Sequence, residues 1–250
     1  VIIIASGYSD EILKTSNTFG LAATDIAKGM ELIGSKQPAL LKTPDILMDV
    51  TRSAATLAKA SGQDLATTAG DLLDVMNTFS LGGDKANETI NLLAAASKFG
   101  AAQVPFVTAA MKNAGAQAKL SNVSLAETVA AIEIMSEKTG LAAEVIGTGM
   151  QSALRKLEKG PKKFRPSVVG LQKALENLNA AGLDTAKMEA LIGGEAVKSF
   201  SALINNANAF GELTNKIQGT NTAQEQASIR MATFNETVKK LWQNIKNQLI

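Results

Sequence analysis

Apolar residues recur at helical spacing along most of the chain, and glycine follows many of these segments. The clearest example is the stretch SNVSLAETVAAIEIMSEKTG, residues 121–140. One apolar stripe on it consists of Leu125, Val129, Ile132 and Met135. Ala130 and Ile134 lie away from that stripe, so a second face is apolar too. A helix with two apolar faces needs neighbours on both sides, and we expect a core helix surrounded by other helices.

The ends of this helix also have local signals. Ser124 stands where a serine caps a helix N-terminus, and Glu127 follows three residues later. This spacing predicts a capping box, in which each side chain bonds the backbone N–H of the other residue. Gly140 is placed to end the helix.

Similar patterns predict helices along most of the remaining sequence. Apart from 124–140, they cover about 9–19, 24–33, 43–60, 64–79, 86–99, 105–118, 146–157, 168–181, 185–192, 197–204 and a long stretch from 222 onward. Thr43 is expected to cap the third of these, with Pro44 at its first position. Residues 1–7 are apolar and predict either a short strand or the tail of a truncated element.

These patterns predict an all-α protein: a compact multi-helix domain of short antiparallel helices, solenoid-like in part, with a longer C-terminal helix. The segment EKGPKKFRP, residues 158–166, has two prolines and a glycine and is the best candidate boundary. We therefore expect a main helical core domain over 1–160. A second helical subdomain over 161–250 would end in the long amphipathic helix. Gly147 and Gly149 lie inside a predicted helix, where such small residues favour a close helix crossing.

Composition excludes several kinds of chemistry. The chain has no His and no Cys, which removes a Ser-His-Asp triad, a thiolate nucleophile, disulfides and the commonest zinc ligand. The net charge of +2 is too small to indicate nucleic-acid binding. No apolar run approaches the roughly 20 residues that span a bilayer. We expect no enzyme activity, no cofactor and no catalytic, cofactor-binding or metal-binding residue.

Some charged groups are candidate sites. Asp71 and Asp74 lie three apart, and Glu133 and Glu137 lie four apart; each pair could serve glycoside hydrolysis, but a solvated helix face is the favoured interpretation. A basic cluster consists of Arg155, Lys156, Lys159, Lys162, Lys163 and Arg165. A solvated boundary loop explains this cluster better than a phosphate or nucleic-acid site, because aromatic residues that could stack bases are nearly absent. Trp242 beside the last apolar stripe fits either core packing or an assembly contact.

Four sequence blocks carry a resemblance to a known family. They are LAKASGQDLATTAGDLLDVMNTFSL, INLLAAASKFGAAQVPFVTAAMKNAGAQAKLSNVSLAETVAAIEIMSEKTGL, GTGMQSALRKL and ALIGGEAVKSFSALINNA. In this order and spacing they resemble the core region of phage tail tape measure proteins, over roughly residues 45–250. The specificity lies in the succession of the blocks, since Ala, Leu and Gly dominate each one.

The resemblance implies a structural segment of a phage or prophage protein involved in tail assembly, tail length determination and DNA ejection. It implies contacts with tail tube protein, tail assembly chaperones and baseplate or tail-tip proteins, in the virion tail and, during assembly, in the bacterial cytoplasm. Two apolar faces per helix also make self-association an expectation. The chain starts without Met and ends within a helical pattern, so we expect a segment of a longer protein. The alternative is a bacterial all-α protein-interaction (adaptor) module without catalytic activity.

Overall fold

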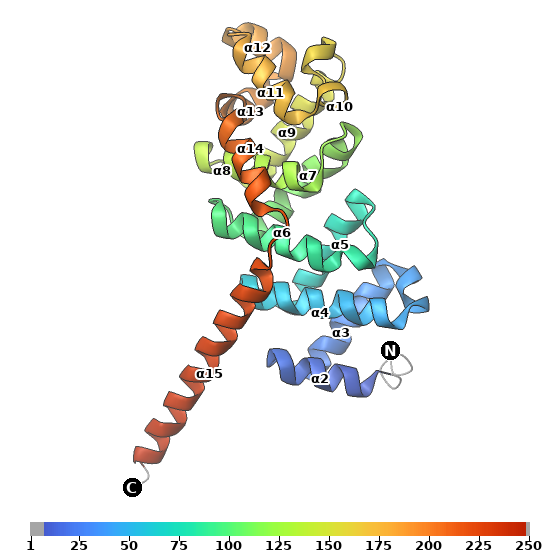
Figure 1. The fold of residues 1–250 in the computed structure, drawn as a ribbon, viewed down its shortest axis with the longest axis vertical. Helices are drawn as coiled ribbons and strands as arrows, with labels where there is room; N and C mark the ends of the chain where they lie inside the picture. The colour runs from blue at the N-terminus through green and yellow to red at the C-terminus, as the bar shows by residue number, and fades with distance from the viewer. Residues whose placement is uncertain (1–7, 249–250) are drawn as a thin grey trace. The chain divides into compact units, whose positions relative to one another are not determined.

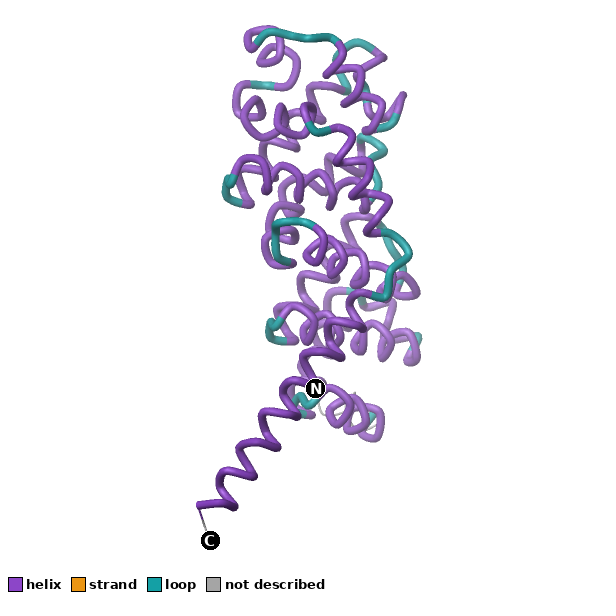
Figure 2. Tube along the Cα trace, turned by 60° about the vertical axis from the view of Figure 1, so that its left-hand side comes forward, coloured by secondary structure: helices purple, strands orange, loops and turns teal. Residues whose placement is uncertain are grey.

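The computed structural model describes residues 8–248, and in this range the chain is built from helices. Side chains of residue 236 and of residues 239–248 lie outside the description. Fourteen α-helices and three short 3-10 helices connect through short loops, and no strand occurs among the described residues (Figure 2). The predicted all-α class is therefore confirmed, whereas the expectation of a short strand over residues 1–7 falls outside the described residues.

The bounds of the helices follow the sequence signals closely. In chain order the α-helices are α2 (Ser9–Phe19), α3 (Ala23–Lys36), α4 (Pro44–Ser61), α5 (Leu65–Phe79), α6 (Ala86–Phe99), α7 (Val104–Leu120), α8 (Leu125–Thr139), α9 (Ala143–Leu157), α10 (Pro166–Val169), α11 (Leu171–Ala180), α12 (Thr185–Ile192), α13 (Gly194–Asn205), α14 (Ala207–Ile217) and α15 (Thr222–Gln248). The 3-10 helices are η1 (Pro38–Lys42), η2 (Gly83–Lys85) and η3 (Lys162–Phe164). The sequence patterns missed α14 as a separate helix.

Two compact units make up the chain, and each combines distant parts of the sequence. One, unit 1, consists of residues 1–73, 83–90 and 221–250, and the other, unit 2, consists of 74–82 and 91–220. Both sides of the predicted boundary segment 158–166 belong to unit 2. There Glu158 accepts a hydrogen bond from the Ser167 backbone N–H at 2.9 Å, and Arg165 Nε donates to the Gly160 carbonyl at 2.7 Å. The division between 1–160 and 161–250 stays a prediction.

Helix α4 is the centre of unit 1. It contacts α2, α3, η1, η2 and α15, and Leu47, Val50 and Leu57 on it are fully buried. Pro44 occupies its first turn as predicted, and Gly62 in the left-handed region ends it. Thr43 occupies the N-cap position as predicted, but its hydroxyl accepts no hydrogen bond from a backbone N–H of the helix and donates to the Leu40 carbonyl at 3.3 Å. Helix α15 contacts α4 near its own start and continues away from it as a single rod (Figure 1).

Helices α8 and α9 form the core of unit 2. Helix α8 contacts α7, α9, α13 and α14, so both of its apolar faces have neighbours. Val129, Ile132 and Met135 on one face, and Ala130 and Ile134 on the other, are all buried. The predicted capping box is confirmed: Ser124 Oγ accepts from the Glu127 N–H at 3.2 Å, and the Ser124 N–H donates to Glu127 Oε2 at 2.9 Å.

The glycines of α9 allow two close helix crossings. A Cβ atom on Gly147 would overlap the backbone oxygen of Ala110 in α7, and one on Gly149 would overlap the Ser199 hydroxyl of α13. Both glycines are buried. The predicted close crossing is therefore confirmed, and α7 and α13 pack against opposite sides of the same turn of α9, because residues two apart point in nearly opposite directions from a helix.

We predict that Gly147→Ala destabilises unit 2. Alanine favours a helix by about 1 kcal/mol over glycine, but overpacking against a backbone oxygen costs typically about 1–3 kcal/mol, so the free energy of unfolding should fall. The matched control is Gly70→Ala in α5, where the nearest atoms to an added Cβ lie 3.8 Å away and alanine should stabilise the chain. Thermal unfolding followed by circular dichroism compares the two. Equal or raised melting temperatures for both variants would contradict the close crossing.

Candidate functional site

The two carboxylate pairs, Asp71 with Asp74 and Glu133 with Glu137, do not form a cluster suited to metal binding. Among the described residues, no group of three or more His, Cys, Asp or Glu side chains could hold a metal ion. Asp71 and Asp74 are half-exposed on α5. Glu137 is exposed on α8 and pairs with Lys138.

For Glu133 the expectation of a solvated helix face is wrong. Its side chain is only 1% exposed, inside unit 2. Oε2 accepts hydrogen bonds from the backbone N–H groups of Ala101 at 2.9 Å and Ala102 at 2.7 Å, in the loop between α6 and α7. A side chain at Gly100 would overlap this carboxylate, so glycine there permits the close approach. Glu133 thus joins α8 to the α6–α7 loop.

The environment of Glu133 favours its neutral form. Burial raises the pKa of the carboxyl from 4.5 to about 7, the two N–H groups lower it, and the nearby Glu137 carboxylate raises it again. Oε1 is buried without a hydrogen-bond partner in the described structure. The two backbone hydrogen bonds to the α6–α7 loop give this buried acid a structural role.

The basic cluster of residues 155–165 is mostly exposed, as the boundary-loop interpretation expected. Several of its members have local structural partners. Arg165 binds the Gly160 carbonyl, and Lys163 Nζ lies 4.9 Å from the centre of the Phe164 ring. Ser152 Oγ donates to the Glu195 carboxylate at 2.6 Å and lowers the pKa of that carboxyl, and the charges of Lys156 and Arg155 lower it further. These contacts leave the nucleic-acid alternative without a positive observation.

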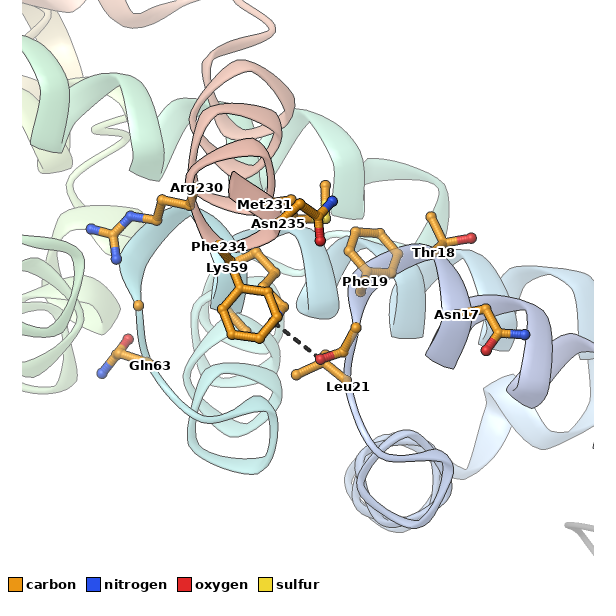
Figure 3. Close-up of a pocket in the computed structure, with 13 residues that line it drawn as sticks. Asn17, Thr18, Phe19, Leu21, Lys59, Gln63, Arg230, Met231, Phe234 and Asn235 are labelled. Atoms are coloured by element: carbon orange, nitrogen blue, oxygen red, sulfur yellow. Dashed lines mark hydrogen bonds between the residues drawn. The ribbon is translucent and has the colours of Figure 1, made fainter. Parts of the chain in front are cut away.

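Unit 1 contains a groove that no sequence pattern indicated. It lies between the end of α2, the end of α4 and one face of α15, and has a volume of about 310 Å³. We call it the α2–α4–α15 groove. Its lining residues are Asn17, Thr18, Phe19, Gly20, Leu21, Ala58, Lys59, Gly62, Gln63, Arg230, Met231, Phe234 and Asn235 (Figure 3).

The geometry of the groove follows from helix ends. Gly20 and Gly62 close α2 and α4 in the left-handed backbone region, which glycine adopts at little cost. Lys59 Nζ donates to the Gly20 carbonyl at 3.4 Å, across the groove floor (Figure 3). The Arg230 guanidinium lies directly over Gly62, so a side chain at residue 62 would collide with it. A cation beside the C-terminus of α4 is favourable for the helix dipole.

The described residues contain no helix that is both long and apolar enough to cross a membrane. The side chain of Trp242 lies outside the described residues, so core packing and an assembly contact both stay predictions for it.

Comparison with known proteins identifies one family. Residues 9–233 match the family of phage-related minor tail proteins. No curated protein and no solved structure matches the chain significantly. The family match covers most of both units, including the groove up to residue 233.

We predict that Glu133 makes the chain less stable as pH rises. The folded carboxyl holds its proton up to a pKa of about 7, whereas the unfolded one releases it near 4.5. The unfolded state therefore binds fewer protons between these values, and the free energy of unfolding falls across this window, by on the order of 3 kcal/mol from this group. Glu133→Gln, a neutral isostere, should remove this fall.

Urea unfolding at pH 5 and pH 8 measures the difference between wild type and variant. The matched control is Glu137→Gln, an exposed carboxylate one turn along the same helix, which should keep most of the wild-type pH dependence. An unchanged pH dependence in Glu133→Gln would refute the assignment of this buried carboxyl.

Proposed function

We propose, from the premise that this chain belongs to the phage-related minor tail protein family, that it is a structural segment of a tail tape measure protein. In this role the whole protein takes part in tail assembly and the determination of tail length, and this segment is a folded part of it and not the extended part that measures length. The family match over residues 9–233 carries the proposal. The succession of sequence blocks over residues 45–250 further supports the tape measure role.

The helical architecture supports a folded segment over an extended one. A tape measure that counts length must be extended, and an uninterrupted helix advances about 1.5 Å per residue. Here most helices end within 8–18 residues and contact one another within their unit. We propose that these residues form folded units within or beside the extended part of the protein. Among the helices that the structure describes, only α15, with 27 residues, has the length of a rod segment.

The same role suggests partners and places. We propose contacts with tail tube protein, tail assembly chaperones and baseplate or tail-tip proteins, in the virion tail and earlier in the bacterial cytoplasm. A rearrangement on DNA ejection would belong to the same role. The absence of His and Cys from the sequence supports a role that is structural and not catalytic.

An in-frame deletion of residues 9–233 from the phage or prophage gene tests the proposal. Electron microscopy then gives tail length, and plating gives infectivity. Roughly 225 residues at about 1.5 Å each would shorten tails by roughly 340 Å if they served as extended tape. We expect tails of normal length with lost infectivity, because the residues act as folded units.

The matched control is Gly70→Ala in the same gene, which should leave both readouts unchanged. Tails shorter by the full amount would show that these residues are extended in the tail, against the folded-unit proposal. Normal tails with normal infectivity would favour the alternative, a bacterial all-α adaptor module.

A further inference from the structure

The α2–α4–α15 groove has an unbalanced charge. Lys59 and Arg230 line it, and no Asp or Glu is among its lining residues. Neither cation forms an ion pair with another described residue, although ion pairs do occur elsewhere in unit 1, such as Arg52 with Glu11. Asp64, the acid nearest to Lys59 in sequence, is engaged at the start of α5, where Oδ1 accepts from the Thr67 N–H at 2.8 Å. The groove therefore presents positive charge that the described chain does not neutralise.

The same groove presents apolar surface. Phe234 lines it from α15 but remains 63% exposed, and Phe19 and Met231 are only half-buried (Figure 3). Large apolar side chains that line a concave surface and stay uncovered are typical of binding sites. The amide side chains of Asn17 and Asn235 at the edge add hydrogen-bond donors and acceptors.

The volume and the positive charge of the α2–α4–α15 groove indicate what kind of ligand it binds. A volume of about 310 Å³ accommodates a few side chains, at the lower end of ligand pockets. Two cations are too few for tight binding to duplex DNA, which relies on many phosphate contacts. Carboxylates next to an aromatic or aliphatic side chain match both the charge and the exposed phenylalanines.

We propose that the α2–α4–α15 groove binds an acidic peptide segment of a partner protein. Carboxylates of that segment pair with Lys59 and Arg230, and its apolar side chain packs between Phe19 and Phe234. Arg230 lies over the α4 C-terminus and Lys59 donates to the Gly20 carbonyl, so both cations already line the groove before a peptide binds. This site does not depend on the tail role, since its geometry would take such a peptide in any partner.

Fluorescence anisotropy with the 250-residue chain tests the site. The probe is a labelled peptide that combines aspartate with phenylalanine and leucine, and we expect a Kd of about 10–100 µM. One control peptide has lysine in place of aspartate, and another has glycine in place of the apolar residues. Both controls should bind at least about tenfold more weakly, because each lacks one half of the complementarity.

Variants locate the binding. The charge reversal Lys59→Glu with Arg230→Glu should weaken binding at least about tenfold, and the neutral pair Lys59→Gln with Arg230→Gln should weaken it by a smaller factor. Phe234→Ser should weaken it about fivefold, since apolar area is lost. The matched control Lys28→Glu with Lys42→Glu changes net charge equally on exposed lysines outside the groove and should bind as wild type. Circular dichroism verifies that each variant is folded.

Four results would overturn the proposal. The first is no binding of the acidic apolar peptide by the wild-type chain, and the second is equal binding by the groove variants and the control variant. The third is tighter binding of a duplex DNA that the groove substitutions abolish, which would indicate a polyanion site. The fourth is concentration-dependent dimerisation lost in the same variants, which would make a second copy of the chain the occupant.

Discussion

The packing of unit 2 depends on how closely helices can approach α9. At Gly147 the backbone of α7 occupies the space of a side chain, and at Gly149 the Ser199 hydroxyl of α13 does the same. Aromatic residues make up only 4% of the sequence, so the core cannot be filled with large rings at wide helix separations. It is built instead from short helices that lie close together, with many buried alanines. Any side chain at these glycines would push apart helices that the rest of unit 2 packs against.

Glu133 adds a polar constraint to this apolar packing. The loop at Ala101 and Ala102 has backbone N–H groups that must be satisfied where it is buried, and the Glu133 carboxylate satisfies both. Burial of a carboxyl in exchange for two backbone hydrogen bonds fixes the loop against α8. Gly100 completes the arrangement, because its missing side chain makes room for the carboxylate. Glu133 and Gly100 therefore act together to fix the α6–α7 loop against α8.

Local features of the fold could be predicted from the sequence, and non-local ones could not. The Ser124–Glu127 box and the end of α8 at Gly140 are decided by residues within one helical turn, and both were predicted correctly. Glu133 was misassigned because a spacing of four from Glu137 fits an exposed face and a buried one equally well. The sequence feature that goes with the burial of Glu133 is Gly100, which lies 33 positions away and leaves room for the carboxylate. No helix was predicted over residues 207–217, although Phe210, Leu213 and Ile217 recur there at helical spacing and are buried.

The α2–α4–α15 groove illustrates the same limit for function. Its charge comes from Lys59 and Arg230, which lie far apart in sequence and belong to no cluster, whereas the conspicuous cluster of residues 155–165 has local partners. Helix ends at Gly20 and Gly62 bring the two cations to one concave surface, and α15 adds Phe234 beside them. Because α15 returns to α4 only after the whole of unit 2 has been traversed, the groove exists only in the folded chain. A chain pulled into an extended tape would lose this surface, so binding at the groove would depend on unit 1 remaining folded.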